Sequence, residues 1–238
     1  MHYDFRIKKD QVEALNAKAF LDNEVDWLLN QAQLLWIKSK INVINPRRSG
    51  LEQDQKRIED LKQLLVKFPE QEGLSVIHHE DEHIYELDLS KLKYSYLYYV
   101  RSWVEVISPK CVTKALVKII QHDDIYHALA DPFNTSDIDT ILANFGRSSN
   151  VNDSSSLYLY PSTEHSLGKI YLEYLRYPPN LSLGTYQYID GKIYPEQSCI
   201  LSEHTHPEIV NMAVQIAANM ADESGTYKSA FEQTQFSD

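Results

Sequence analysis

The sequence predicts an α+β fold: a small helical bundle, made of an N-terminal helical hairpin and a C-terminal helix, together with an antiparallel β-sheet or sandwich. Apolar residues recur with helical spacing near both ends of the chain, whereas the middle is rich in β-branched and aromatic residues. Because helices and strands are segregated along the sequence, this pattern favours α+β over α/β. We expect a helical bundle of residues 1–70 and 203–224, a β-rich domain of 71–202, and an extended C-terminal tail of 225–238.

The N-terminal hairpin is predicted from two amphipathic segments. Residues 22–41 place apolar side chains at i, i+3, i+4 and i+7, the spacing of one buried helical face, and Asn45-Pro46 then ends the helix. A second helix is predicted from Leu51 to Phe68, where it stops at Pro69. Each helix needs a partner for its apolar face, so we expect the two to pack together.

The middle of the chain predicts a succession of strands separated by turn residues. A short apolar run and an alternating segment indicate a strand–turn–strand unit over 74–89, and residues 131–156 show no clear periodicity. The other expected elements are strands at 94–107 and 111–120, a short helix at 123–130, strands at 157–160 and 169–177, and a hairpin of 186–189 with 192–194.

The C-terminal helix has a clear start signal. Thr205 and Glu208 have the spacing of a capping box, and Pro207 lies in the first turn, where its missing N–H is harmless. An apolar stripe continues to about Asp222. The tail that follows is polar but contains Tyr227, Phe231 and Phe236, three aromatic residues that we expect to bind a partner.

The composition is that of an ordinary globular protein with an acidic surplus. Of 238 residues, 43% are hydrophobic and 24% are charged, and the formal net charge of −11 opposes nucleic-acid binding unless basic residues gather on one face. No apolar run has the length of a membrane span. Cys111 and Cys199 lack metal-binding or redox spacing, and the glycine-rich phosphate loops are absent from the sequence. We therefore predict no cofactor.

One motif has the residue types of a zinc site. His79-Glu80-Asp81-Glu82-His83 matches H-E-x-x-H, in which two histidines one helical turn apart bind zinc and the glutamate activates a water molecule. That chemistry requires a helix, but the segment lies between two strand-like runs. We interpret it as a hairpin turn and predict no metal site. A zinc-dependent hydrolase using His79, Glu80 and His83 remains the alternative from a different class.

Tyrosines dominate the aromatic residues. There are 16 tyrosines against 7 phenylalanines, and tyrosine is favoured where a surface is apolar yet partly wet, as at protein interfaces. The densest run includes Tyr96, Tyr98 and Tyr99. A stacking platform for single-stranded nucleic acid is the alternative, which the net charge disfavours. We predict that these three tyrosines contribute to a subunit interface.

Four segments resemble a group of tailed-phage virion proteins. They occur in order along the chain: LNQAQ followed by WIK (29–38), HDDIYHALADPF (122–133), YLEYLRYPP (171–179) and SEHTHPEIVNMAVQIA (202–217). In this combination they resemble the head-to-tail connector, or ring, proteins of crAss-like phages and related phages of Bacteroidetes. Residues 134–156 do not match that pattern.

The resemblance implies a non-enzymatic, structural virion protein. It would form a ring, a dodecamer by analogy, that joins the portal to the tail and lines the channel through which genomic DNA passes without sequence-specific binding. Its partners would be the portal protein, neighbouring copies and other tail or ring proteins, with no membrane involved. The protein would be assembled in the host cytoplasm and located in the virion. Tyr227, Phe231 and Phe236 would then anchor the tail on the portal or an adjacent ring.

A second alternative keeps the interaction role but not the ring. The chain would then be a virion or host interaction module that binds protein partners without docking on the portal. The oligomeric state in the presence of portal protein separates this alternative from the connector. A strand over 76–88, or the absence of bound zinc, would dispose of the hydrolase.

Overall fold

The computed structural model contains two compact units, which are described separately. One consists of Met1–Leu64 with Pro178–Asp238, and the other of Leu65–Tyr177. We call them the helical unit and the sheet unit. The residues that the structure describes are 1–10, 20–41, 56, 58–67, 74, 76–79, 83–108, 111–147, 155–187 and 193–220.

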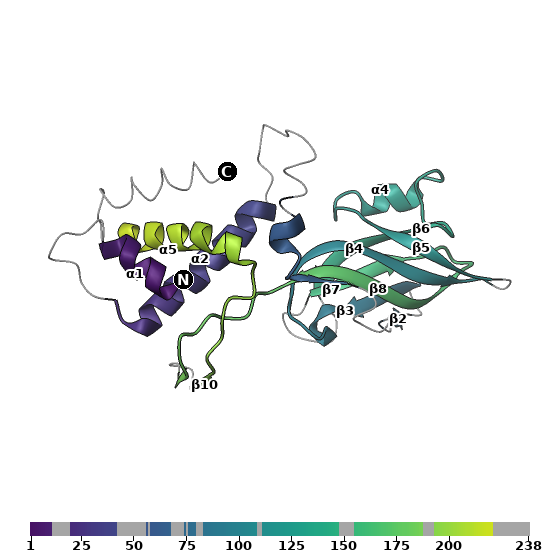
Figure 1. Ribbon diagram of the computed structural model, residues 1–238. Coiled ribbons are helices and arrows are strands. Elements are labelled where there is room, and N and C mark those ends of the chain that lie inside the picture. The colour runs from purple at the N-terminus through teal and green to yellow at the C-terminus, as the bar shows by residue number, and fades with distance from the viewer. Residues whose placement is uncertain are drawn as a thin grey trace. The chain divides into compact units, whose positions relative to one another are not determined.

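The helical unit is built on three helices: α1 (His2–Asp10), α2 (Asp22–Ile41) and α5 (His206–Met220). In Figure 1, α5 lies alongside both α1 and α2, in agreement with the residue contacts between them. The predicted helix over 22–41 is confirmed. Most of its apolar side chains are buried, as the amphipathic spacing requires, but Leu35 and Trp27 are 48% and 40% exposed. The buried side chains include Val25, Leu28, Leu29, Ala32 and Trp36.

Helix α1 was not predicted, because its nine residues are mostly polar or charged and only Phe5 is fully buried. The predicted start of α5 is also corrected in detail. A short 3-10 helix η2 (Glu203–Thr205) precedes α5, and the Thr205 hydroxyl donates to the Ser202 carbonyl oxygen at 2.8 Å. Glu208 forms tertiary contacts, described below, in place of the expected capping contact.

The predicted N-terminal hairpin is only partly seen. Residues 56 and 58–61 are helical, but residues 62–64 form a turn and β1 (Leu65–Val66) is a strand. A helix over the whole of 51–68 is therefore wrong at its C-terminal end. Residues 65–66 pair with a strand of the sheet, which satisfies backbone groups that a helix end would leave open. The long packing partner of α2 is α5.

The sheet unit contains one eight-stranded sheet in the order β1-β8-β4-β5-β6-β7-β3-β2. Besides β1, sequence reasoning missed β6, which lies in the segment without periodicity. The remaining strands are β2 (Ile77–His79), β3 (Ile84–Asp88), β4 (Tyr96–Ile107), β5 (Val112–Ile119), β6 (Thr140–Arg147), β7 (Ser155–Tyr160) and β8 (Ser166–Arg176).

The sheet is mixed, which corrects the antiparallel prediction. All neighbouring strands are antiparallel except β5 and β6, which run parallel with Leu116 opposite Thr140 and Ile119 opposite Ala143. Parallel neighbours need a crossover connection, and this one contains the helix α4 (Ile125–Ala130). Figure 1 shows α4 beside β6, where it covers part of one face of the sheet.

The sheet curls around one core and is not a pair of stacked sheets. The two edge strands are near neighbours in sequence: β1 pairs with β8, Leu74 forms a bridge to Ile170 of β8, and β2 pairs with β3. The two edge strands, β1 and β2, thus come from neighbouring parts of the chain, between residues 65 and 79. The enclosed cluster draws on every long strand and includes Tyr85, Leu87, Val104, Val106, Val117, Ile141, Leu157, Leu159, Ile170 and Tyr174.

The chain leaves the sheet at the double proline Pro178-Pro179, as predicted. The predicted hairpin then forms a two-stranded sheet of β9 (Tyr186–Gln187) and β10 (Ile193–Tyr194), while its turn residues Asp190-Gly191 lie outside the described residues. These strands belong to the helical unit, so the predicted limit of the β-rich domain at residue 202 differs from the observed division.

Polar side chains of α2 hold the segment after β8 within the helical unit. The Leu181 N–H donates to Asn30 at 2.6 Å, and the Leu183 N–H donates to the buried carboxylate of Asp26 at 3.2 Å. His2 also bonds to Asp26, at 2.5 Å. Among the described residues, no helix is long and apolar enough to cross a membrane.

Candidate functional site

The two histidines of the zinc-like motif lie on a β-hairpin. His79 is the last residue of β2, and His83 precedes β3 with a positive φ of 53°. Glu80 lies outside the described residues. The strands predicted on both sides of the motif are confirmed, so the helix that brings two such histidines onto one zinc ion is not formed.

Separate partners engage the two histidines. His79 Nε2 lies 2.9 Å from a carboxylate oxygen of Glu86, whereas His83 Nε2 lies 3.2 Å from the carbonyl oxygens of both Ser162 and His165. Within the described part of the chain, no three His, Cys, Asp or Glu side chains are grouped so that they could hold a metal ion. The two histidines at the ends of the motif therefore have separate partners, and residues 80–82 between them lie outside the described residues.

Glu86 is a fully buried carboxyl group on β3. Its two oxygens have different partners: Ser156 of β7 donates its hydroxyl at 2.7 Å, and His79 of β2 makes the contact at 2.9 Å. Burying a carboxyl group is costly unless hydrogen bonds replace water. Glu86 thus links three neighbouring strands and fixes the His79 ring at the edge of the sheet.

The predicted interface tyrosines have different environments. Tyr96 and Tyr99 pack against the core of the sheet, with ring centroids 6.0 Å and 5.6 Å from that of Phe145. Irregular pairing of β4 with β8 around Tyr98 brings these two tyrosines to the same side of the strand. Burial raises the pKa of Tyr96 to about 12 and also raises that of Tyr99. Tyr98 is partly exposed. A subunit contact through the three remains a prediction.

A groove of about 950 Å³ lies between α4 and the outer face of the sheet. Its walls come from the ends of β2 and β3 on one side and from α4 with the preceding turn on the other, and β6 with β7 forms the floor. Its lining mixes polar and aromatic side chains, which makes it a candidate binding surface of the sheet unit. The lining residues are His79, Ile84, His122, Ile125, Tyr126, Leu129, Asn144, Gly146, Arg147, Tyr158 and Tyr160.

Hydrogen bonds order the floor of this groove. The Tyr160 hydroxyl donates to Asn144 Oδ1 at 3.2 Å, and the Asn144 amide lies 3.3 Å from His122 Nδ1. The Tyr158 hydroxyl donates to the carbonyl oxygen of Arg147 at 2.6 Å. The side chains of Tyr160, Asn144, His122 and Tyr158 are thereby held in place before any partner arrives, which lowers the entropy cost of binding.

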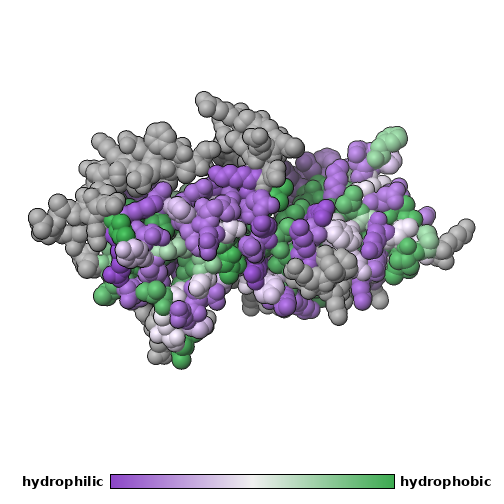
Figure 2. Space-filling model, in the orientation of Figure 1, coloured by the Kyte–Doolittle hydropathy of each residue, from purple (hydrophilic) through white to green (hydrophobic). Residues whose placement is uncertain are grey.

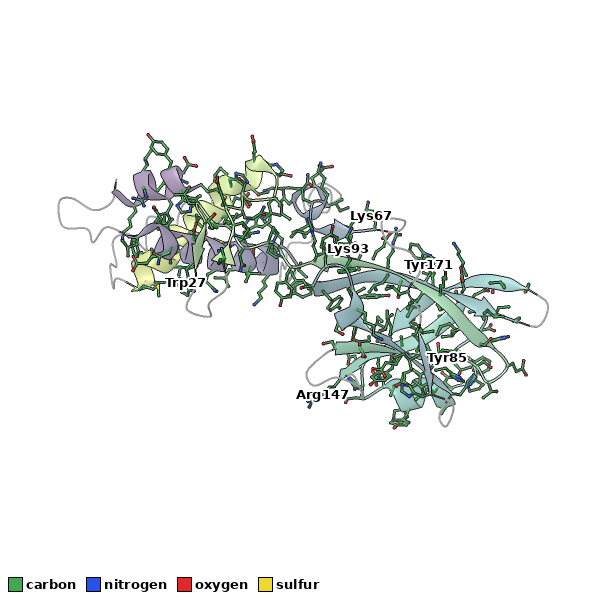
Figure 3. All side chains as sticks on the ribbon, turned by 90° about the horizontal axis from the view of Figure 1, so that it is seen from below. Trp27, Lys67, Tyr85, Lys93, Arg147 and Tyr171 are labelled. Atoms are coloured by element: carbon green, nitrogen blue, oxygen red, sulfur yellow. The ribbon has the colours of Figure 1, made fainter. Side chains whose placement is uncertain are left out.

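A second candidate surface is the outer face of β8, β4 and β5. Trp103 stacks on Tyr171 with ring centroids 6.3 Å apart, and Arg101 and Lys114 lie over these rings at 5.5 Å and 5.1 Å. The Tyr171 hydroxyl donates to Glu105 at 2.6 Å, and this bond raises the tyrosine pKa. Figure 3 labels Tyr171 on β8, well separated from Arg147 at the end of β6.

The sheet unit also carries large apolar side chains in solvent. Leu116 and Val112 on the outer face of β5 are 61% and 63% exposed, and Tyr126 and Phe133 around α4 are 82% and 94% exposed. Figure 2 shows hydrophobic residues at the visible surface, scattered among hydrophilic ones. The four side chains on β5 and around α4 are therefore candidate contact positions for a partner protein.

In the helical unit, Glu208 joins α5 to α2. Its carboxylate accepts the Trp36 indole N–H at 2.6 Å and lies 3.2 Å from Lys40 Nζ and 3.5 Å from Lys56 Nζ. Burial acts to raise the pKa of Glu208, but the Trp36 hydrogen bond and the two lysine charges outweigh it, so the pKa is lowered. Glu208 therefore has a structural role, because it connects α5 to α2. Both helices contain segments that resemble the connector proteins.

The predicted tail residues Tyr227, Phe231 and Phe236 lie outside the described residues. Sequence reasoning also missed the groove, because β6 had no recognisable period. The run Ile141-Leu142-Ala143, short and apolar before Gly146, is the signal that could have found that strand. Comparison with protein-family models finds no match to this chain, and comparison with curated proteins finds no significant similarity.

Proposed function

We propose that this protein is a structural subunit of a phage head-to-tail connector, assembled as a ring and acting through its interfaces. The observation that carries the proposal is the set of exposed apolar side chains on the sheet unit, with Leu116 and Val112 on one surface and Tyr126 and Phe133 around α4. In an assembly, a neighbouring subunit would cover such side chains, including Phe133, which is 94% exposed.

The positions of the resembling segments support an assembly role. The segments within 29–38 and 202–217 lie in α2 and α5, where Trp36 bonds to Glu208 and stabilises the helical unit. The segments 122–133 and 171–179 include α4 and the end of β8, next to exposed apolar and aromatic residues. Segment 122–133 thus contributes exposed side chains, whereas the other three segments contribute buried residues to packing.

The charge of the chain is consistent with a channel for DNA. With a net charge of −11, a ring of such subunits would repel the phosphate backbone and let DNA slide without specific contacts. In this proposal the partners are the portal protein, neighbouring copies and other tail or ring proteins. The bound partners, and not a reacting substrate, would cover the apolar side chains.

The test is cryo-electron microscopy of the purified protein mixed with the portal protein of the same phage. We expect a ring with the symmetry of the portal, stacked on it, and no such ring when portal protein is replaced by an unrelated ring-forming protein. A chain that stays monomeric beside the portal would overturn the connector proposal. Binding to another virion protein without a ring would instead favour the interaction module.

A further inference from the structure

The groove under α4 has an unusual charge for this chain. Although the sequence has 34 acidic residues, the groove lining contains no Asp or Glu among the described residues. It contains instead Arg147 and two histidines, His79 and His122. The neighbouring Asp123 and Asp124 are exposed but do not line it. The groove therefore suits a partner with an acidic surplus.

The rest of the lining is aromatic and aliphatic. Tyr126, Tyr158 and Tyr160 surround a space bounded by Ile84, Ile125 and Leu129. Tyrosines present a large apolar surface at a small cost in conformational entropy, and they pair well with aromatic side chains of a partner. A segment that combines carboxylates with aromatic rings satisfies both the charge and the apolar character of the groove.

The chain itself contains a segment of this kind. Residues 221–238, after the end of α5, carry four acidic side chains against one lysine, together with Tyr227, Phe231 and Phe236. We propose that the groove of the sheet unit binds residues 221–238 of a neighbouring copy. This inference rests on the proposed function, because it supplies a contact between neighbours in the ring.

Length and symmetry make such a contact feasible. Eighteen residues follow Met220, and an extended segment of that length reaches about 60 Å, enough to cross from one subunit to the next. A tail from one copy in the groove of the next is a heterologous contact, which closes into a ring when the rotation per subunit permits. Each copy then both donates a tail and accepts one.

A photo-crosslinking experiment on the full chain tests this contact directly. Phe231 is replaced by a photoreactive benzoylphenylalanine, and copies grown on heavy and light nitrogen are mixed before assembly and irradiation. We expect crosslinks from residue 231 of one isotope to groove residues of the other, located by mass spectrometry. Crosslinks confined to a single copy, or directed to surfaces outside the groove, would overturn the proposal.

A matched pair of charge reversals adds a second readout. Arg147→Glu is expected to reduce the crosslinked fraction about tenfold, because it places a carboxylate opposite the acidic tail. Lys118→Glu is the control, since it makes the same charge change at an exposed position of β5 that does not line the groove. If both variants reduce the crosslinked fraction equally, only the net charge of the protein matters, and the proposed binding of the tail in the groove is contradicted.

A fluorescent peptide with the sequence of residues 221–238 provides an independent measurement if the photoreactive variant does not fold. Its anisotropy is expected to rise with the full-length protein and not with Arg147→Glu, while a scrambled peptide stays free. Equal binding of the tail peptide and the scrambled peptide would contradict specific binding of the tail in the groove. A portal-bound ring without the groove crosslink overturns only this inference, whereas the crosslink without a portal-bound ring overturns only the connector proposal.

Discussion

The ring of Tyr158 lies across Gly146 on the neighbouring strand. A Cβ atom added at Gly146 would lie 2.6 Å from Tyr158 Cε2 and 2.9 Å from Cδ2, well inside van der Waals contact. The tyrosine hydroxyl then reaches the carbonyl oxygen of Arg147 at 2.6 Å. The absence of a side chain at Gly146 thus permits the position of the ring on the floor of the groove, a cross-strand use of glycine common in sheets.

Gly146→Ala is expected to destabilise the sheet unit by about 1–3 kcal/mol, because the methyl group displaces the Tyr158 ring. Chemical denaturation followed by circular dichroism measures the change. The Tyr158→Ala background is the control, since Gly146→Ala costs less there if the ring is the obstacle. The same cost in both backgrounds would contradict the steric explanation.

Ser156→Ala is expected to lower the free energy of unfolding by about 1.5–3 kcal/mol, because it removes a hydrogen bond to the buried Glu86 carboxyl group. Ser102→Ala is the matched control. Ser102 is also fully buried in a strand, but its hydroxyl meets the neutral Tyr99 hydroxyl at 3.0 Å, and its loss should cost about 1 kcal/mol. A larger loss for Ser102→Ala than for Ser156→Ala would count against this reading of Glu86.

The lowered pKa of Glu208 predicts acid sensitivity of the helical unit. Because the folded protein holds this carboxyl below its ordinary value of 4.5, its ionised form stabilises the fold above that pH. The contribution is lost as the pH falls through the folded-state pKa. Glu208→Gln is therefore expected to lower the thermal midpoint near neutral pH and to flatten its decline on acidification, measured between about pH 3 and pH 7.

Glu203→Gln is the control for this pH series. Glu203 lies in η2, close to Glu208 in sequence, but it is exposed. Its substitution removes one carboxylate without disturbing the contact between α2 and α5, so the acid-induced decline should match that of the unmodified chain. A steep decline that persists in Glu208→Gln would assign the acid sensitivity to other carboxyl groups.

Leu116→Glu is expected to abolish ring formation with the portal while leaving the thermal midpoint within about 1 °C of the unmodified chain, because a side chain that is 61% exposed contributes little to folding. Native mass spectrometry and microscopy measure the assembly. Ile193→Glu, at a 70% exposed residue of β10, is the control and should still assemble. If Leu116→Glu still forms normal rings, the outer face of β5 is not part of the subunit interface.

The local pattern of the sequence was sufficient for α2, α5 and most of the strands. Helix α2 has an amphipathic stripe of mostly buried residues, and β4 and β5 are long runs of β-branched and aromatic residues on either side of Ser108-Pro109 in the sequence. The strands on both sides of the His79–His83 motif were also predicted, because the flanking alternation outweighed the helical motif. In each case the signal lies within the segment itself.

The elements that were missed depend on distant partners. Leu65 and Val66 continue a helical pattern in sequence, but pairing with β8 makes them a strand. Strand β6 has only a short apolar run as its sequence signal, and its parallel pairing with β5 follows from a crossover through α4. The groove could not be predicted for the same reason, because its lining residues Asn144, Gly146 and Arg147 all come from β6.

By itself the sequence determined the α+β class, the boundaries of α2 and the alternation of buried and exposed residues, because these follow from side-chain periodicity within a single segment. Only the tertiary structure decided that the sheet is mixed and curled, that Tyr96 and Tyr99 face its core, and that Arg147 meets Tyr158 under α4. Those facts depend on which strand pairs with which, and the free energy of that choice is distributed over contacts between residues far apart in the chain.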